Sequence, residues 1–169
     1  MFEERIVERP AFNVVARKAW ITLEAPENFV LLMREAEENG LIDKLKGYSA
    51  EYTNSADGMD GVTKSSFLGV AIMTIDGMDY YLSAEVPEGI SDADLETLTI
   101  PAARWAIIKG EGASLADVSA LEQYSYGEWL QTSGCALTDA PQMNVFFVGG
   151  AEEYTELWLP IIIVSEIRA

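Results

Sequence analysis

The sequence predicts an α+β fold built from two strand-helix-strand-strand repeats. Strand-like and helix-like periodicities alternate along the chain in the same order twice. In addition, Pro10 and Pro101 each precede an apolar strand, and a lysine, Lys18 or Lys109, follows each proline eight residues later. The two prolines are 91 residues apart, and so are the two lysines. The shared order and these pairs favour an internal duplication. We therefore expect one antiparallel sheet, with helices on one face and a groove on the other.

The size and composition of the chain suit one domain. Of its 169 residues, 49% are hydrophobic, which is enough to bury a core without a partner. We expect a single domain over residues 1–169, with the first repeat at about 8–90 and the second at about 97–166.

The first repeat begins with a strand at residues 10–21, which are rich in β-branched and aromatic side chains. Residues 25–40 change to helical spacing of the apolar positions. Residues 41–66 are polar and rich in turn formers, so we expect a long connection there that serves as a lid over the groove. Two strands at 67–75 and 79–86, joined by a tight turn, complete the unit.

The second repeat has the same order. Residues 99–112 read as its opening strand, and residues 114–134 have helical spacing with Ser114 as the expected N-cap. Apolar runs at 142–148 and 156–164 are its closing strands.

The composition excludes several classes of function. The chain has no histidine and a single cysteine, Cys135, so we expect no internal disulfide, no metal site and no cofactor. A net charge of −17 opposes binding to nucleic acid. No apolar run approaches the roughly 20 residues of a membrane helix, and the N-terminus is charged where a signal peptide is apolar. We therefore expect a cytoplasmic protein that binds neither nucleic acid nor membrane.

Four segments in the second half carry a family resemblance: "LTIPAARWAIIKGEG", "YGEWLQTSG", "APQMNVFF" and "ELWLPI". In this order they resemble the GyrI-like or AraC-type effector-binding domain, and the chain looks like a stand-alone member. The resemblance implies two strand-helix-strand-strand units that are related by a pseudo-twofold axis, with a ligand cleft at their junction. Members of the family include small-molecule binders, a DNA gyrase inhibitor and hydrolases that act on cyclopropane-bearing electrophiles.

Strand alternation selects the first candidate site residues. In "DYYLSAEV", Tyr81, Ser83 and Glu85 share one face, and the alternate residues, beginning with Tyr80, share the other. The first set combines an aromatic ring, a hydroxyl and a carboxylate, which suits a pocket for an amphipathic or cationic molecule, so we expect it to line the cleft. The alternative is that Tyr81 and Glu85 face solvent from an open sheet.

Aromatic residues of the second repeat are further candidates. Trp105 shares a strand face with Ile107, and the resemblance places Trp105 where the family usually has a tyrosine. It also places Phe146 at the position of a family strand tyrosine, and Trp158 has similar status. A tryptophan would favour a flat aromatic ligand or a cation. The alternative is that Trp105 is a core residue that seals the two halves.

Asn144 is the main departure from the family. It stands where many relatives have a glutamate that receives a cationic ligand, and an amide cannot neutralise a charge. Either Glu85 or Glu128 therefore supplies the negative group, or the ligand is neutral. The alternative for Glu128 is a solvated position on the outer face of its helix.

These observations favour non-catalytic binding of a hydrophobic, aromatic small molecule, cationic or neutral, as in drug or effector binding. One alternative is a hydrolase of the same family that acts on cyclopropane-bearing electrophiles. Another is a protein-binding inhibitor of the DNA gyrase type.

Overall fold

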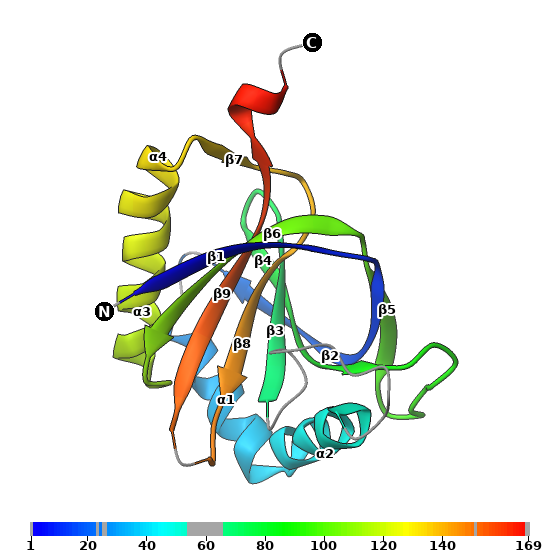
Figure 1. Cartoon of the computed structure of the whole chain (residues 1–169). Coiled ribbons are helices and arrows are strands. Elements are labelled where there is room, and N and C mark those ends of the chain that lie inside the picture. The colour runs from blue at the N-terminus through cyan, green and yellow to red at the C-terminus, as the bar shows by residue number, and fades with distance from the viewer. Residues whose placement is uncertain (1, 23, 25–26, 54–65, 151, 168–169) are drawn as a thin grey trace.

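A computed structural model describes residues 2–22, 24, 27–53, 66–150 and 152–167. Nine strands among these residues form the sheet, and helices pack against it (Figure 1). The strands are β1 Glu3–Arg9, β2 Phe12–Thr22, β3 Ser66–Met73, β4 Gly77–Val86, β5 Glu96–Ile100, β6 Ala103–Glu111, β7 Cys135–Leu137, β8 Gln142–Phe147 and β9 Tyr154–Ile163. The helices are α1 Asn28–Glu38, α2 Leu41–Thr53, α3 Leu115–Tyr124 and α4 Leu130–Thr132, with a π-helical turn at Ser125–Trp129 and a 3₁₀ turn at Val164–Glu166. The predicted α+β class is confirmed.

The order of strands in the sheet follows the predicted symmetry. The order is β1-β6-β9-β8-β3-β4-β2-β5, with β7 added beside β9, and the paired strands are antiparallel. Under this symmetry the strands correspond in pairs, β1 with β5, β2 with β6, β3 with β8, and β4 with β9. If the two members of every pair are exchanged, the same strand order results, read from the other end of the sheet. The pseudo-twofold axis therefore passes between β3 and β8, where Gly69 lies opposite Asn144.

Pro10 and Pro101 occupy equivalent corners of the fold. Pro10 lies between β1 and β2, and Pro101 lies between β5 and β6, where a residue without a backbone N–H interrupts the ladder. The expected strand at 99–112 is thus two strands with a corner at the proline. Because β1 pairs with β6 and β5 pairs with β2, the leading strand of each repeat crosses to the other repeat.

Residues 41–53 form helix α2, so the prediction of a turn-rich connection and lid was wrong over this range. Gly40, with a φ of 81°, allows the chain to turn after α1. Leu41, Leu45 and Ser49 then recur at helical spacing and are buried, which fixes α2 against the sheet as part of the core. The remainder of the expected lid, residues 54–65, lies outside the described residues.

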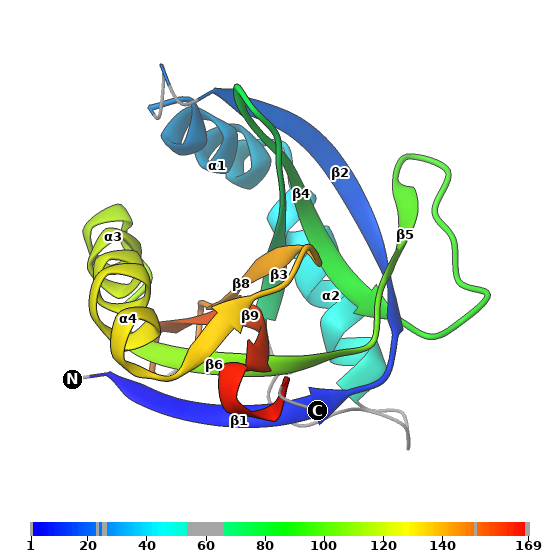
Figure 2. The same cartoon turned by 90° about the horizontal axis from the view of Figure 1, so that it is seen from above.

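The sheet separates two apolar regions. The helices lie on one face, as predicted, where α1 and α2 cover the first repeat and α3 covers the second. The other face carries a cluster made of strand residues alone, and the sheet bends around it, with β6 and β1 on one side and β4 and β2 on the other (Figure 2). No helix within the described ranges is long and apolar enough to cross a membrane.

Candidate ligand-binding site

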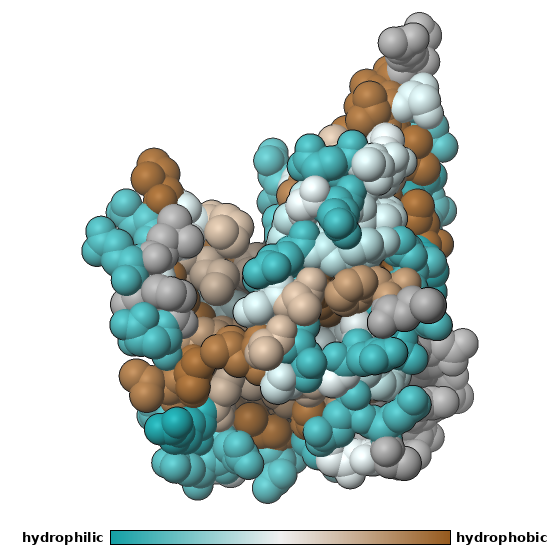
Figure 3. Space-filling view, turned by 90° about the vertical axis from the view of Figure 1, so that its left-hand side faces the viewer, coloured by the Kyte–Doolittle hydropathy of each residue, from teal (hydrophilic) through white to brown (hydrophobic). Residues whose placement is uncertain are grey.

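A cavity of about 500 Å³ lies between the two repeats, on the helix-bearing face of the sheet. We expected a groove on the opposite face, but there the bent sheet encloses a closed core. Figure 3 looks onto the open side, where the surface is hollowed and apolar side chains border the hollow. The lining residues are Ile21, Thr22, Phe29, Ala71, Met73, Met78, Tyr80, Leu115, Val118, Ser119, Glu122, Tyr126, Gln142, Met143, Asn144 and Leu157.

Most of this lining is apolar and comes from both repeats. Phe29 of α1 meets the ring of Tyr80 edge to face, with the ring centroids 5.4 Å apart. Across the cavity, α3 contributes Leu115 and Val118. Walls of this kind favour an apolar ligand because they remove its surface from water.

Glu122 of α3 supplies the only carboxylate among the described residues that line the cavity, and neither lysine nor arginine is among them. Loss of water around the carboxyl group raises the pKa of Glu122. The Glu122 side chain nevertheless remains in contact with solvent, because the cavity is open on one side. Its carboxylate is therefore crowded by apolar atoms and yet accessible to a ligand.

Two tyrosines lie near this carboxylate. Burial, together with the charge of Glu122, raises the pKa of both Tyr80 and Tyr126. Both phenols therefore stay protonated at neutral pH and can donate hydrogen bonds. The hydroxyl of Tyr126 donates to Oε1 of Gln142, which belongs to β8.

The second phenol binds an amide on the same strand. Oη of Tyr80 donates to Oδ1 of Asn144 over 3.2 Å, and both side chains are buried. Gly69 makes this contact possible, because a Cβ atom at Gly69 would lie only 1.8 Å from Oη of Tyr80. The ring thus lies against the bare backbone of β3.

Helix α3 places the carboxylate and one phenol by simple periodicity. Ser114 caps the helix: its Oγ accepts from the backbone N–H of Asp117, and Oδ2 of Asp117 accepts from the N–H of Ser114. From this fixed start, Ser119, Glu122 and Tyr126 follow on one face at helical spacing. Tyr126 belongs to the π-helical turn, an irregularity that is frequent at functional sites.

Of the residues predicted from the sequence, Asn144 lines the cavity, whereas Tyr81, Ser83 and Glu85 lie on the other face of β4. The expected assignment of the two faces is reversed, because alternation defines two faces without saying which one the helices cover. Glu85 is 2% exposed, and both of its oxygens accept hydrogen bonds from Nη2 of Arg9, at 2.7 and 2.5 Å. Burial raises the pKa of Glu85, and Arg9 opposes that shift.

The aromatic candidates lie outside the cavity lining. Trp105, Ile107 and Trp158 belong to the closed core of strand residues, where the two indole rings lie 5.8 Å apart. This arrangement matches the alternative reading of Trp105 as a core residue. Phe146 is on the helix-bearing face, stacked on Phe67 in the core.

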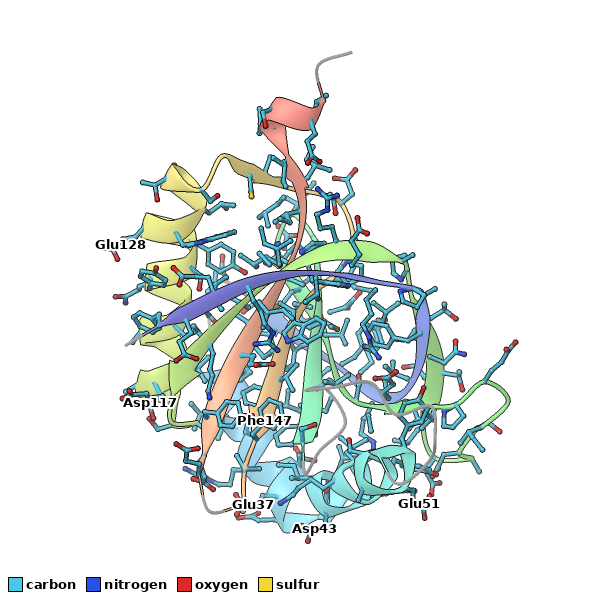
Figure 4. All side chains as sticks on the ribbon, in the orientation of Figure 1. Glu37, Asp43, Glu51, Asp117, Glu128 and Phe147 are labelled. Carbon is cyan, nitrogen blue, oxygen red and sulfur yellow. The ribbon has the colours of Figure 1, made fainter. Side chains whose placement is uncertain are left out.

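Glu128 is exposed, and its side chain points away from the sheet on the outer side of the helix (Figure 4). It therefore occupies the solvated position that was the alternative for this residue. Neither Glu85 nor Glu128 brings a charge to the cavity lining.

The sequence reasoning missed Glu122 and Tyr126. A signal was present: Leu115, Ser119, Glu122 and Tyr126 form a stripe at helical spacing beside the buried stripe that contains Val118 and Leu121. An acid and a phenol at the border of a buried stripe face neither full solvent nor the core, which is the position of a cavity wall.

Three solved structures share this fold. SAV2435 bound to tetraphenylphosphonium is 16% identical, with a TM-score of 0.77 over 98% of each chain. The integron cassette protein VCH_CASS2, from the mobile metagenome of Vibrio cholerae, is 14% identical, with a TM-score of 0.56 over 95% of this chain and 97% of that one. A hydrolase from Listeria innocua is 9% identical, with a TM-score of 0.53 over 95% and 92%. No curated protein matches the sequence.

A protein family described as integron-associated effector binding protein matches residues 5–161. That range includes the first repeat, the second repeat up to residue 161, and every residue that lines the cavity. The chain therefore belongs to the family of integron-associated effector-binding proteins and has the fold of the GyrI-like effector-binding domains that its sequence resembles.

Proposed function

We propose that the protein binds a hydrophobic aromatic cation in the cavity between the repeats, without converting it, and that Glu122 recognises the positive charge. The observation that carries this proposal is an apolar cavity of about 500 Å³ whose described lining has one carboxylate and no basic side chain.

The electrostatics favour a cationic ligand over an anionic one. Glu122 is ionised at a cost, since its apolar surroundings raise its pKa. A cation beside the carboxylate offsets that cost, whereas an anion adds repulsion. The net charge of −17 also concentrates cations around the molecule.

The shape and chemistry of the walls favour aromatic groups. A volume of about 500 Å³ is typical of sites for small organic molecules. The rings of Phe29, Tyr80 and Tyr126 can stack on aromatic groups or contact a cation through their faces. The neighbour SAV2435, bound to tetraphenylphosphonium, supports this class of ligand by analogy of fold.

The lining supports binding rather than catalysis. Tyr80 and Tyr126 have raised pKa values and cannot act as bases at neutral pH. Ser119 is the one serine in the described lining, and no hydrogen bond joins it to a base in the described part of the chain. The cavity thus offers positioning groups without a paired nucleophile and base.

The proposal is tested by titrating tetraphenylphosphonium into the wild type, Glu122→Gln and Glu128→Gln, with calorimetry as the readout. We expect wild-type binding and a loss of about tenfold or more in Glu122→Gln, because the amide cannot pair with the cation. Glu128→Gln is the matched control: it removes one charge from the outer side of the same helix and should leave the affinity near wild type. Equal losses in both variants would assign the effect to overall charge and refute the role of Glu122.

The hydrolase alternative has one observation in its favour. A glutamate with a raised pKa in an apolar cavity, like Glu122, can position water or donate a proton. Incubation with cyclopropane-bearing electrophiles, followed by mass spectrometry, tests it. Turnover that Glu122→Gln abolishes would replace simple binding with catalysis.

A further inference from the structure

The contact between Tyr80 and Asn144 leaves hydrogen-bond donors without acceptors. The hydroxyl and the amide together carry three polar hydrogens, and their mutual hydrogen bond uses one of them. Nδ2 of Asn144 has no partner among the described residues, and the side chain is 7% exposed. If the amide is turned over, its N–H donates to Oη and the phenol hydrogen is left over instead. Either orientation therefore leaves unpaired donors on side chains that line the cavity.

This pair is held in place by its surroundings. Tyr80 is 1% exposed, and its ring fits over Gly69, the residue that lies directly opposite Asn144 across β3 and β8. Phe29 contacts the same ring edge to face. These contacts fix the position of the phenol beside Asn144.

An unpaired buried donor is a cost that the empty protein carries. A ligand atom that accepts from it removes this cost, whereas an apolar ligand atom leaves it in place. The carboxylate of Glu122, on α3, is an acceptor and serves a different part of a ligand. The cavity thus combines a site for positive charge with a separate site for an oxygen acceptor.

Resting on the proposed function, we infer that the Tyr80–Asn144 pair is a hydrogen-bond donor site and that the preferred ligands are aromatic cations that also carry a carbonyl or similar acceptor oxygen. Glu122 then favours cations over other ligands, and Asn144 favours those cations that carry an acceptor oxygen. A permanent cation without an acceptor, such as tetraphenylphosphonium, interacts with Glu122 but accepts no hydrogen bond from Asn144.

Two matched probes test the inference: (4-acetylbenzyl)triphenylphosphonium and (4-isopropylbenzyl)triphenylphosphonium. They share the cation and have similar size, but one has a carbonyl oxygen where the other has a methyl group. We expect the affinity ratio, acetyl over isopropyl, to be about tenfold higher in the wild type than in the double variant Tyr80→Phe/Asn144→Leu, which keeps the shape of the pair and removes all three polar hydrogens. Gln123→Leu, which removes an exposed amide of α3 outside the cavity lining, should keep the wild-type ratio.

A second measurement needs no variant. The carbonyl stretching band of the acetyl probe, carrying ¹³C at that carbon, should lie at lower frequency in the wild-type complex than in a dry aprotic solvent of low polarity, because a hydrogen bond weakens the C=O bond. An unshifted band, or equal affinity ratios in the wild type and the Tyr80→Phe/Asn144→Leu variant, overturns the donor site while the cation proposal stands. If neither probe nor tetraphenylphosphonium binds the wild type, the proposed function fails and the donor site falls with it.

Discussion

Glu122 is the residue on which the proposed specificity depends, and its titration should be visible in binding. A raised pKa means that this carboxyl takes up its proton at a higher pH than the usual 4.5. As the pH falls through that raised value, a bound cation loses its charge partner. The nearby titratable groups, Tyr80 and Tyr126, stay protonated over the same range because their pKa values are raised too.

We therefore expect the affinity for tetraphenylphosphonium, whose charge is permanent, to drop about tenfold on the acid side of this titration in the wild type. Glu122→Gln should show a flat profile at the lower affinity. The measurement is a series of calorimetric titrations between neutral and mildly acid pH. A wild-type profile as flat as that of the variant would contradict the assignment. For the empty protein the sign is opposite: the ionised Glu122 costs stability at neutral pH, and protonation removes that cost.

The sequence singled out Asn144, which lines the cavity, but not Tyr80, its hydrogen-bond partner there. Asn144 could be singled out because it replaces an acid in a recognisable segment. Tyr80 and Tyr81 are neighbours with identical side chains, and strand alternation does not say which of them faces the helices. That outcome depends on pairings between distant strands, which local periodicity does not contain.

At the scale of elements, α3 positions the site from its first residue. The reciprocal hydrogen bonds of Ser114 and Asp117 fix the start of the helix, and Glu122 and Tyr126 follow about two and three turns after Ser114. Gly112, with a φ of 77°, lets the chain pass close beneath the Asp117 side chain on the way into the helix.

Ser114→Ala should lower the free energy of unfolding by about 1 kcal/mol, the usual effect of losing an N-cap side chain. Urea denaturation followed by circular dichroism measures it. Ser91→Ala, a change at an exposed serine between β4 and β5, serves as the control and should stay within about 0.5 kcal/mol of the wild type. A loss no larger than that of the control would mean that the helix start is held by other contacts.

The elements that the sequence predicted well are those whose pattern is local. The helix beginning at Ser114 and the hairpin of β3 and β4 follow from capping and turn signals. Helix α2 was missed because its polar residues outnumber the buried positions that define its face. The leading strands β1 and β5 were missed because their side chains are mostly exposed, so no alternation marks them.

At the scale of the whole molecule, the two repeats depend on each other. Strand β1 pairs with β6 and β5 pairs with β2, so each repeat completes the edge of the other. The pairing of β3 with β8 joins them again at the centre of the sheet. A repeat taken alone would lose three strand pairings and expose the apolar core that the bent sheet encloses.

We expect the whole chain to unfold in one cooperative step, with coincident transitions by circular dichroism and tryptophan fluorescence. Fragments 1–90 and 91–169, divided in the connection between β4 and β5, should show no cooperative transition when each is alone. Mixing the two fragments should restore folded signal. A sharp transition in either isolated fragment would show that the repeats are independent units.

The pairing of Gly69 with Asn144 has a consequence for how a ligand is oriented. The ladders make these two residues counterparts under the pseudo-twofold axis, since Gly69 faces Leu82, Asn144 faces Leu157, and those leucines correspond. The ring of Tyr80 covers Gly69 on one side of the axis, and the amide of Asn144 lies on the other, so the two halves of the cavity present different chemistry. For the proposed ligand, the two ways of lying across the axis therefore differ in energy, and we expect a single bound orientation.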